Sequence, residues 1–105
     1  MKSQVARRLR SLEDEIRGAR TELAIARDEL AARRARSADL WARALVSETP
    51  VTDRAYGDAE RERRRVEERV AERESRLLAL MQEEAQVTLR LHARATPNLE
   101  ATEET

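Results

Sequence analysis

The side chains able to carry acid–base or metal chemistry are one histidine, His92, and 21 carboxylates. No Cys or carboxylate accompanies His92 at a metal-ligand spacing, so a solvated surface histidine is the simpler interpretation. So many acidic residues form close pairs by chance, and Glu-rich helices normally present them to solvent. Gly18 and Gly57 stand alone, which excludes a Gly-rich phosphate loop, and the absence of cysteine excludes disulfides and thiolate-bound zinc. We therefore expect no catalytic residue, metal, cofactor or small-molecule substrate, and predict that the protein is not an enzyme.

Arginine is the other side chain with distinctive chemistry, because its guanidinium binds phosphate in a bidentate manner. Lys2 is the only lysine among the 21 basic residues, an excess of arginine that codon usage in a GC-rich genome also explains. The densest arginines are Arg33, Arg34 and Arg36, and Arg61, Arg63, Arg64 and Arg65. Interleaved glutamates and a net charge of zero oppose a nucleic-acid function, since nucleic-acid-binding domains are usually strongly basic. Nucleic acid is therefore the alternative partner, not the favoured one.

The composition indicates which elements position these side chains. Of 105 residues, 40% are charged and 40% hydrophobic, but only 2% are aromatic. Ordinary globular cores rely on more aromatic and β-branched residues, whereas chains rich in Ala, Glu, Arg and Leu form long helices or coiled coils. One domain at most fits this length.

A heptad pattern runs through the first half of the chain. Steps of four and three residues connect Val5, Leu9, Leu12, Ile16, Ala19, Leu23, Ala26, Leu30, Arg33, Ser37, Leu40 and Ala44. A repeat of 3.5 residues sustained over this length is typical of a coiled-coil seam. Pro50 disfavours helical geometry at Thr49 and so predicts a helix boundary there.

A second seam follows the proline. It comprises Tyr56, Ala59, Arg63, Val66, Val70, Arg73, Leu77, Leu80, Glu84, Val87 and Leu91. Thr52 and Asp53 are candidate N-caps for this helix. Two long helices joined by a short turn fold back on each other. We therefore predict an all-α, long antiparallel two-helix coiled-coil hairpin over residues 1–95, with helix 1 at about 3–48, a turn at about 49–53 and helix 2 at about 54–95. Residues 96–105 are predicted to be a disordered acidic tail.

The register of the pair follows from the centre of the turn. A turn centred between Val51 and Thr52 makes the numbers of facing residues add up to about 103, because that sum is constant in an antiparallel pair. This register predicts the ion pairs Arg27–Glu74, Arg34–Glu67, Glu15–Arg90, Glu29–Arg76 and Arg43–Glu62.

Two surfaces remain for a partner. Trp41 and Leu45 of the first helix, and Leu78, Met81 and Ala85 of the second, fall on one flank that a two-helix pair leaves uncovered. A broadened core edge is one interpretation; packing of a second copy or of another protein's helix is the other, and the one we favour. The second surface is the hairpin tip, formed by Glu48, Val51, Asp53, Arg54 and Tyr56. Aromatic residues beside arginine are typical of binding hot spots, although Val51 and Tyr56 could also serve only to pack the turn.

Part of the tip resembles a known family. Ser47-Glu48 and Ala55-Tyr56 resemble the tip of Gre-type transcript-cleavage factors, helical hairpins that insert into the secondary channel of RNA polymerase. The spacing differs and the paired acidic residues of that family are missing, so we assign no family.

The sequence thus predicts a non-enzymatic coiled-coil protein–protein interaction module, a small adaptor, scaffold or regulatory subunit. Its partner would be a protein bound by helix packing, either a second copy, with which it would form a four-helix bundle, or a different chain. The alternative is a nucleic-acid- or RNA-polymerase-associated regulatory factor that uses the arginine-rich half near the tip. The first residues are charged and no apolar run reaches the roughly 18–20 residues that cross a bilayer, so we expect a cytoplasmic protein that does not bind membranes.

Overall fold

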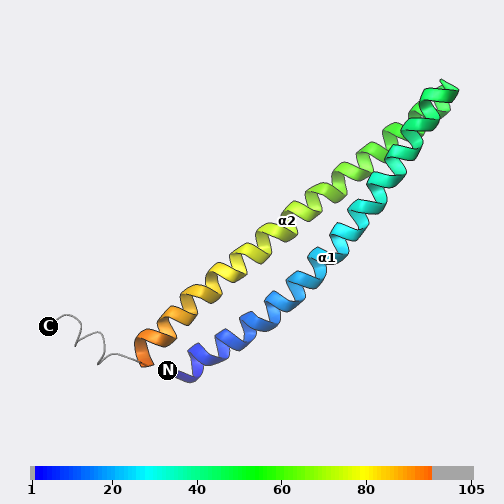
Figure 1. Cartoon of the computed structure of the whole chain (residues 1–105). Helices are drawn as coiled ribbons and strands as arrows, with labels where there is room; N and C mark the ends of the chain where they lie inside the picture. Colours follow the sequence, from blue (N-terminus) through cyan, green and yellow to red (C-terminus); the bar gives the residue numbers. More distant parts are fainter. Residues whose placement is uncertain (1, 96–105) are drawn as a thin grey trace. The chain divides into compact units, whose positions relative to one another are not determined.

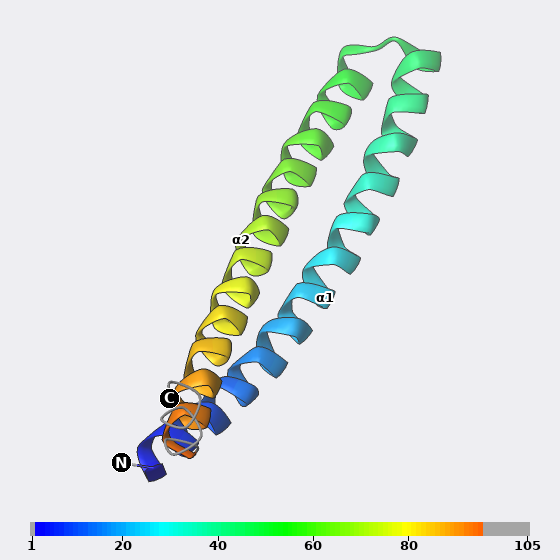
Figure 2. The same cartoon turned by 60° about the vertical axis from the view of Figure 1, so that its left-hand side comes forward.

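Both heptad-patterned stretches are helical in the computed structural model, which describes the backbone of residues 2–95 and the side chains of residues 4–93. α1 comprises Lys2–Ser47 and α2 comprises Pro50–Ala95, with no strand in the described range. The two helices run in opposite directions on either side of a short turn (Figure 1, Figure 2). The prediction of an all-α antiparallel hairpin is confirmed. The tail predicted at 96–105 lies outside the described residues.

The helix pair divides into two compact units. Within the described range, unit 1 comprises residues 2–19 of α1 with residues 76–95 of α2. Unit 2 comprises Arg20–Ser75 and includes the turn. Each unit pairs a segment of α1 with a segment of α2, so each has a seam of its own.

The predicted seam is buried in both units, and every residue assigned to it is buried or half-buried. Leu12 in unit 1 and Val66 in unit 2 are both 0% exposed. The other buried seam residues are Ile16, Ala19 and Val87 in unit 1, and Leu23, Ala26, Leu30, Ser37, Ala44, Ala59 and Val70 in unit 2. Full burial of a leucine or valine contributes about 1.5–3 kcal/mol, so the seam is the main source of cohesion.

The turn is shorter than predicted, because α2 begins at Pro50 and not near residue 54. Proline suits the first position of a helix, where its missing N–H would be unpaired in any case. Thr49 is the N-cap, in place of the predicted Thr52 or Asp53. The Thr52 N–H donates to Thr49 Oγ1 and the Thr49 N–H donates to Thr52 Oγ1, both at 3.2 Å. This reciprocal pair works as a capping box does.

The end of α1 is capped by a left-handed residue. Glu48 has a φ of 46°, and its N–H donates to the Ala44 carbonyl at 3.0 Å. This is the αL motif, in which glycine is the usual residue because it carries no Cβ. Glu48 and Thr49 alone therefore connect the helices.

The shorter turn changes the register by about one heptad. The numbers of facing residues add up to about 97 and not to about 103, because the turn is centred between Glu48 and Thr49. The Arg27–Glu74 ion pair forms as predicted, at 3.2 Å. The predicted Glu29–Arg76 and Arg43–Glu62 pairs are wrong. The observed pairs of these residues are Arg69–Glu29, Arg33–Glu29, Arg33–Glu62, Arg65–Glu62 and Arg43–Asp39.

Candidate interaction surface

A polar network centred on Glu60 joins the helices of unit 2 near the turn. Ser37, which is buried in the seam, donates from Oγ to Glu60 Oε1 at 2.9 Å, and the Tyr56 hydroxyl donates to the same oxygen at 3.0 Å. Arg63 donates from Nε to Glu60 Oε2 at 2.7 Å. The Arg63 guanidinium, followed by the Ser37 hydroxyl, holds the pKa of Glu60 below its usual value. A network in which each of these groups has a partner fixes the local geometry.

Tyr56 in turn supports Trp41. The two ring centroids are 5.2 Å apart and the ring planes are inclined by 49°, within the range of favourable aromatic pairs. The hydrogen bond to the Glu60 carboxylate is the main cause that raises the pKa of the Tyr56 hydroxyl, because an ionised phenol could no longer donate it. Trp41 remains 50% exposed. The result is a half-exposed indole that rests on an anchored tyrosine.

One flank of unit 2, which we name the Trp41 face, is hollowed between the helices. It is formed by Arg20, Ala24, Arg27, Ala31, Arg34, Ala38, Trp41 and Leu45 of α1 and by Tyr56, Glu60, Arg63, Arg64, Glu67, Ala71 and Glu74 of α2. A groove of about 500 Å³ lies between the Arg27–Arg34 and Glu67–Glu74 segments, lined also by the buried Leu30 and Val70. A second groove of about 260 Å³ adjoins Trp41 and Tyr56. Small alanines between long charged side chains leave this face concave.

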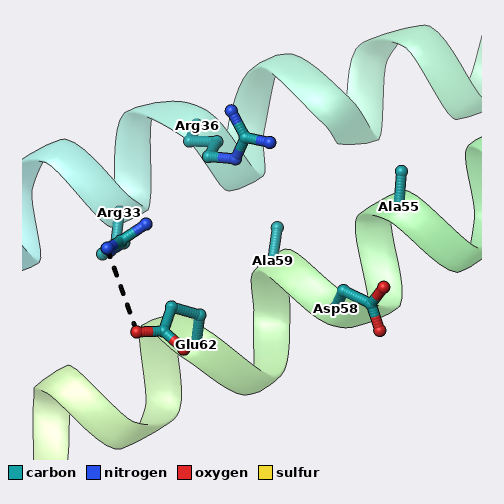
Figure 3. A pocket seen from close by; sticks show the side chains of 6 residues that line it. All are labelled: Arg33, Arg36, Ala55, Asp58, Ala59 and Glu62. Carbon is teal, nitrogen blue, oxygen red and sulfur yellow. Dashed lines mark ion pairs between the residues drawn. The ribbon is translucent and has the colours of Figure 1, made fainter.

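The opposite face of unit 2 is crossed by ion pairs. Arg69 pairs with Glu29 at 2.8 Å and Arg73 with Glu22 at 3.4 Å. Near the turn, Arg33 pairs with Glu62 at 3.9 Å. Figure 3 shows this pair, with Arg36 on α1 and Ala55, Asp58 and Ala59 on α2 lining the same hollow of about 260 Å³. Charge on this face is largely matched within the chain.

The residues predicted for the apolar flank are exposed, but they belong to different units. Trp41 and Leu45 lie in unit 2, and Leu45 is 58% exposed. Leu78, Met81 and Ala85 lie in unit 1, where Leu78 is 57% and Met81 41% exposed and Ala85 is also exposed. Their spacing of three and four residues places these last three on one side of α2. The predicted flank therefore contributes one exposed apolar group to each unit.

The predicted tip residues are distributed over the turn and the start of α2. Glu48 is the left-handed cap of α1, and Val51, Asp53 and Arg54 are exposed residues in the first turns of α2. Val51 is 77% exposed. Tyr56 is half-buried and faces Trp41, so it belongs to the Trp41 face and not to the extreme tip.

Sequence reasoning missed the Glu60 network and three exposed apolar residues, Ile25, Val46 and Leu89. The sequence did contain an indication of the Glu60 network. Ser37 is a polar residue in an otherwise apolar stretch of seam, and Tyr56, Glu60 and Arg63 have the spacing of side chains that meet on one helix face. The three apolar residues occupy outward heptad positions, where single exposed hydrophobic side chains are common.

The arginines near the turn mostly pair with carboxylates of the same helix. Arg61 pairs with Asp58, Arg63 with Glu60 and Glu67, and Arg65 with Glu62. Such pairs at a spacing of three or four residues are normal on charged helices. They leave a smaller positive field than the arginine count alone indicates.

In the described part of the chain, no group of three or more His, Asp and Glu side chains is placed to hold a metal ion. Neither described helix has an apolar stretch able to cross a membrane. Comparison of the chain with protein families, with curated proteins and with solved structures finds no match.

Proposed function

We propose that this protein is a non-enzymatic protein–protein interaction module, an adaptor, scaffold or regulatory subunit that binds through the Trp41 face. The observation that carries the proposal is Trp41 itself, a half-exposed tryptophan next to a groove. Tryptophan is enriched in binding hot spots. Tyr56 and Glu60 already hold the aromatic pair, so a partner has less side-chain motion to restrict on binding.

The size of the effect follows from the exposed area. A tryptophan buries about 150–250 Å², so covering the exposed half of Trp41 removes about 75–125 Å² from water. At about 25 cal/mol per Å², this contributes about 2–3 kcal/mol to binding. Leu45, 58% exposed, adds about 1–1.5 kcal/mol. Two side chains on one face thus supply a useful binding anchor.

The alternative, a nucleic-acid- or RNA-polymerase-associated regulatory factor, has less support. Arg61, Arg63 and Arg65 are engaged with neighbouring carboxylates, which reduces the charge offered to phosphates. Binding to DNA or RNA that weakens steeply as salt is raised would favour this alternative. No binding at low salt would remove it.

Site-specific photo-cross-linking tests the proposal. A photoreactive amino acid replaces Leu45 on the Trp41 face or, as a matched control, Asp28 on the exposed outer side of α1. We expect specific protein cross-links from position 45 and not from position 28, with the product identified by mass spectrometry. Equal labelling from both positions would contradict the proposal.

Affinity measurements with the purified cross-linked protein give the second readout. Trp41→Ala should weaken binding by about 30- to 150-fold, which corresponds to the 2–3 kcal/mol above. Circular dichroism should show the same helix content for wild type and variant. Unchanged affinity with unchanged helicity would show that Trp41 is not an anchor.

A further inference from the structure

The two helices contribute charges of opposite sign to the Trp41 face. Along α1, an arginine recurs every seven residues on this face, at Arg20, Arg27 and Arg34. Along α2, a glutamate recurs every seven residues on this face, at Glu60, Glu67 and Glu74. Between them are small residues: Ala24, Ala31 and Ala38 on α1, and Ala71 on α2. Arg63, which lines the groove beside Trp41, and Arg64 are charges of contrary sign on the α2 side of the face in unit 2. The α1 half of the face is therefore basic, and the α2 half carries a smaller net negative charge.

Within the chain, the glutamates of this face are matched, since Glu60 and Glu67 pair with Arg63 and Glu74 pairs with Arg27, whereas the arginines of α1 are matched only in part. Among the described residues, Arg27–Glu74 is the one ion pair that crosses the Trp41 face, and Arg34 makes no ion pair. The opposite face is crossed by Arg33–Glu62, Arg69–Glu29 and Arg73–Glu22. A partner that presents glutamate to α1 would pair with Arg20 and Arg34, which make no ion pair among the described residues.

From this complementarity we propose that the Trp41 face binds a second copy of the chain, with α1 of each copy packed on α2 of the other. The inference rests on the proposed function, since it names the partner of the same face. A twofold axis parallel to the helices produces this arrangement and places both turns at the same end. The reverse dimer, with α1 on α1, would bring the rows of arginines together, and like charges in contact are unfavourable.

The register of unit 2 fits this arrangement. Within one copy, the numbers of facing residues add up to about 97. If the second copy is not shifted along the helix direction, residues that face each other across the interface have the same sum. Arg27 then lies between Glu67 and Glu74 of the other copy, and Arg34 lies between Glu60 and Glu67. The small alanines let the helices approach closely, as Ala positions do in tightly packed helix pairs.

The available area is sufficient for a dimer. From Arg20 to Leu45 the face follows about 37 Å of helix, and two adjacent helices are about 20 Å wide. This gives about 750 Å² per copy, or about 1,500 Å² in total, within the range of about 1,200–2,000 Å² for stable specific interfaces.

Sedimentation equilibrium of the full chain is the first test. Wild type should give twice the 12.1 kDa chain mass. Arg34→Glu alone and Glu67→Arg alone should each weaken the dimer at least about tenfold, because each reversal acts at two symmetry-related sites. An equimolar mixture of the two variants should recover the dimer, because each reversed charge then faces an opposite one. Glu13→Arg, a charge reversal outside unit 2, is the matched control and should leave the mass unchanged.

Spin labels determine the orientation without altering the charges of the face. The chain has no native cysteine, so Val51→Cys, at an exposed position next to the turn, can be labelled selectively. The two labels should be about 10–25 Å apart, about one to two helix diameters. A separation of more than about 35 Å would contradict the shared-end arrangement.

Each outcome separates this inference from the proposed function. A monomer at every concentration overturns the second-copy inference, while cross-links from position 45 to another protein would still support the proposed function. A dimer that neither charge reversal weakens places the interface elsewhere and overturns the inference. A dimer with restored mass in the mixture and short label distances supports it.

Discussion

Truncation of Leu12 tests whether the seam holds unit 1 together. Leu12 is fully buried, at 0% exposed, and Leu12→Ala removes the equivalent of about three methylene groups. At about 0.8 kcal/mol each, the lost burial is about 2.4 kcal/mol, and a residual cavity can raise the loss to about 5 kcal/mol. Leu89→Ala in the same unit is the matched control, because Leu89 is 69% exposed and the chemical change is identical.

Urea denaturation followed by circular dichroism measures both variants. With a slope of about 1–3 kcal/mol per M for small proteins, the lost burial of about 2.4 kcal/mol alone should lower the midpoint for Leu12→Ala by about 0.8–2.4 M. Leu89→Ala should change the free energy of unfolding by less than about 0.5 kcal/mol. Equal midpoint shifts for the two variants would refute the assignment of Leu12 to the seam and Leu89 to the surface.

Three further predictions concern the caps, the helix interior and the polar network. Glu48→Gly should raise the free energy of unfolding by about 0.5–1 kcal/mol. The substitution removes the cost of about 1–2 kcal/mol of a left-handed non-glycine residue, and the greater freedom of glycine in the unfolded chain offsets part of this gain. A loss of stability would contradict the αL cap. Gly18→Ala should raise it by about 1 kcal/mol, since an added Cβ meets no atom within 4 Å, and thermal unfolding that shows a decrease would contradict this. Tyr56, the one tyrosine of the chain, should titrate by absorbance above pH 10.0, and Glu60→Gln should move its pKa down towards that value. The raised pKa means that the contribution of Tyr56 to stability is present below pH 10.0 and is lost as pH rises through the folded-state value. Nuclear magnetic resonance should show a pKa of Glu60 below 4.5, and Arg63→Gln should raise that pKa. The contribution of Glu60 to stability is present above pH 4.5 and is lost as pH falls through the folded-state pKa.

The seam could be predicted from the sequence because burial along a helix pair depends on a periodicity that single residues do not disturb. Arg33, Arg63 and Arg73 occupy seam positions and are half-buried, since an arginine can lay its aliphatic stem on the seam while the guanidinium reaches solvent. The pattern therefore identified the buried side of both helices even where it was not apolar.

The register could not be predicted from the same pattern. A shift of seven residues places seam positions opposite seam positions again, so apolar residues still face apolar ones. The length of the turn decides between such registers, and the turn depends on the reciprocal Thr49–Thr52 bonds and on Pro50 at the first helical position. Reading Pro50 as the first residue of a helix, and not as a breaker before one, would have given the correct register.

The exposed residues of the candidate site were predictable from the sequence, but the contacts that hold them in place were not. Heptad position alone placed Trp41 and Leu45 outside the seam. The contact of Trp41 with Tyr56 depends on which residues of α1 and α2 are opposite, and so on the register. The same holds for the hydrogen bond from Ser37 to Glu60.

Fluorescence of Trp41 measures most directly whether its face binds a protein, because it is the one tryptophan of the chain. Emission and acrylamide quenching are recorded as the chain concentration is raised, and again on addition of any protein identified by cross-linking from position 45. If the Trp41 face binds a protein, emission should shift to shorter wavelength and quenching should decrease in step with association, because the half-exposed indole leaves water. Association demonstrated by mass with no change in Trp41 emission or quenching would contradict binding through the Trp41 face.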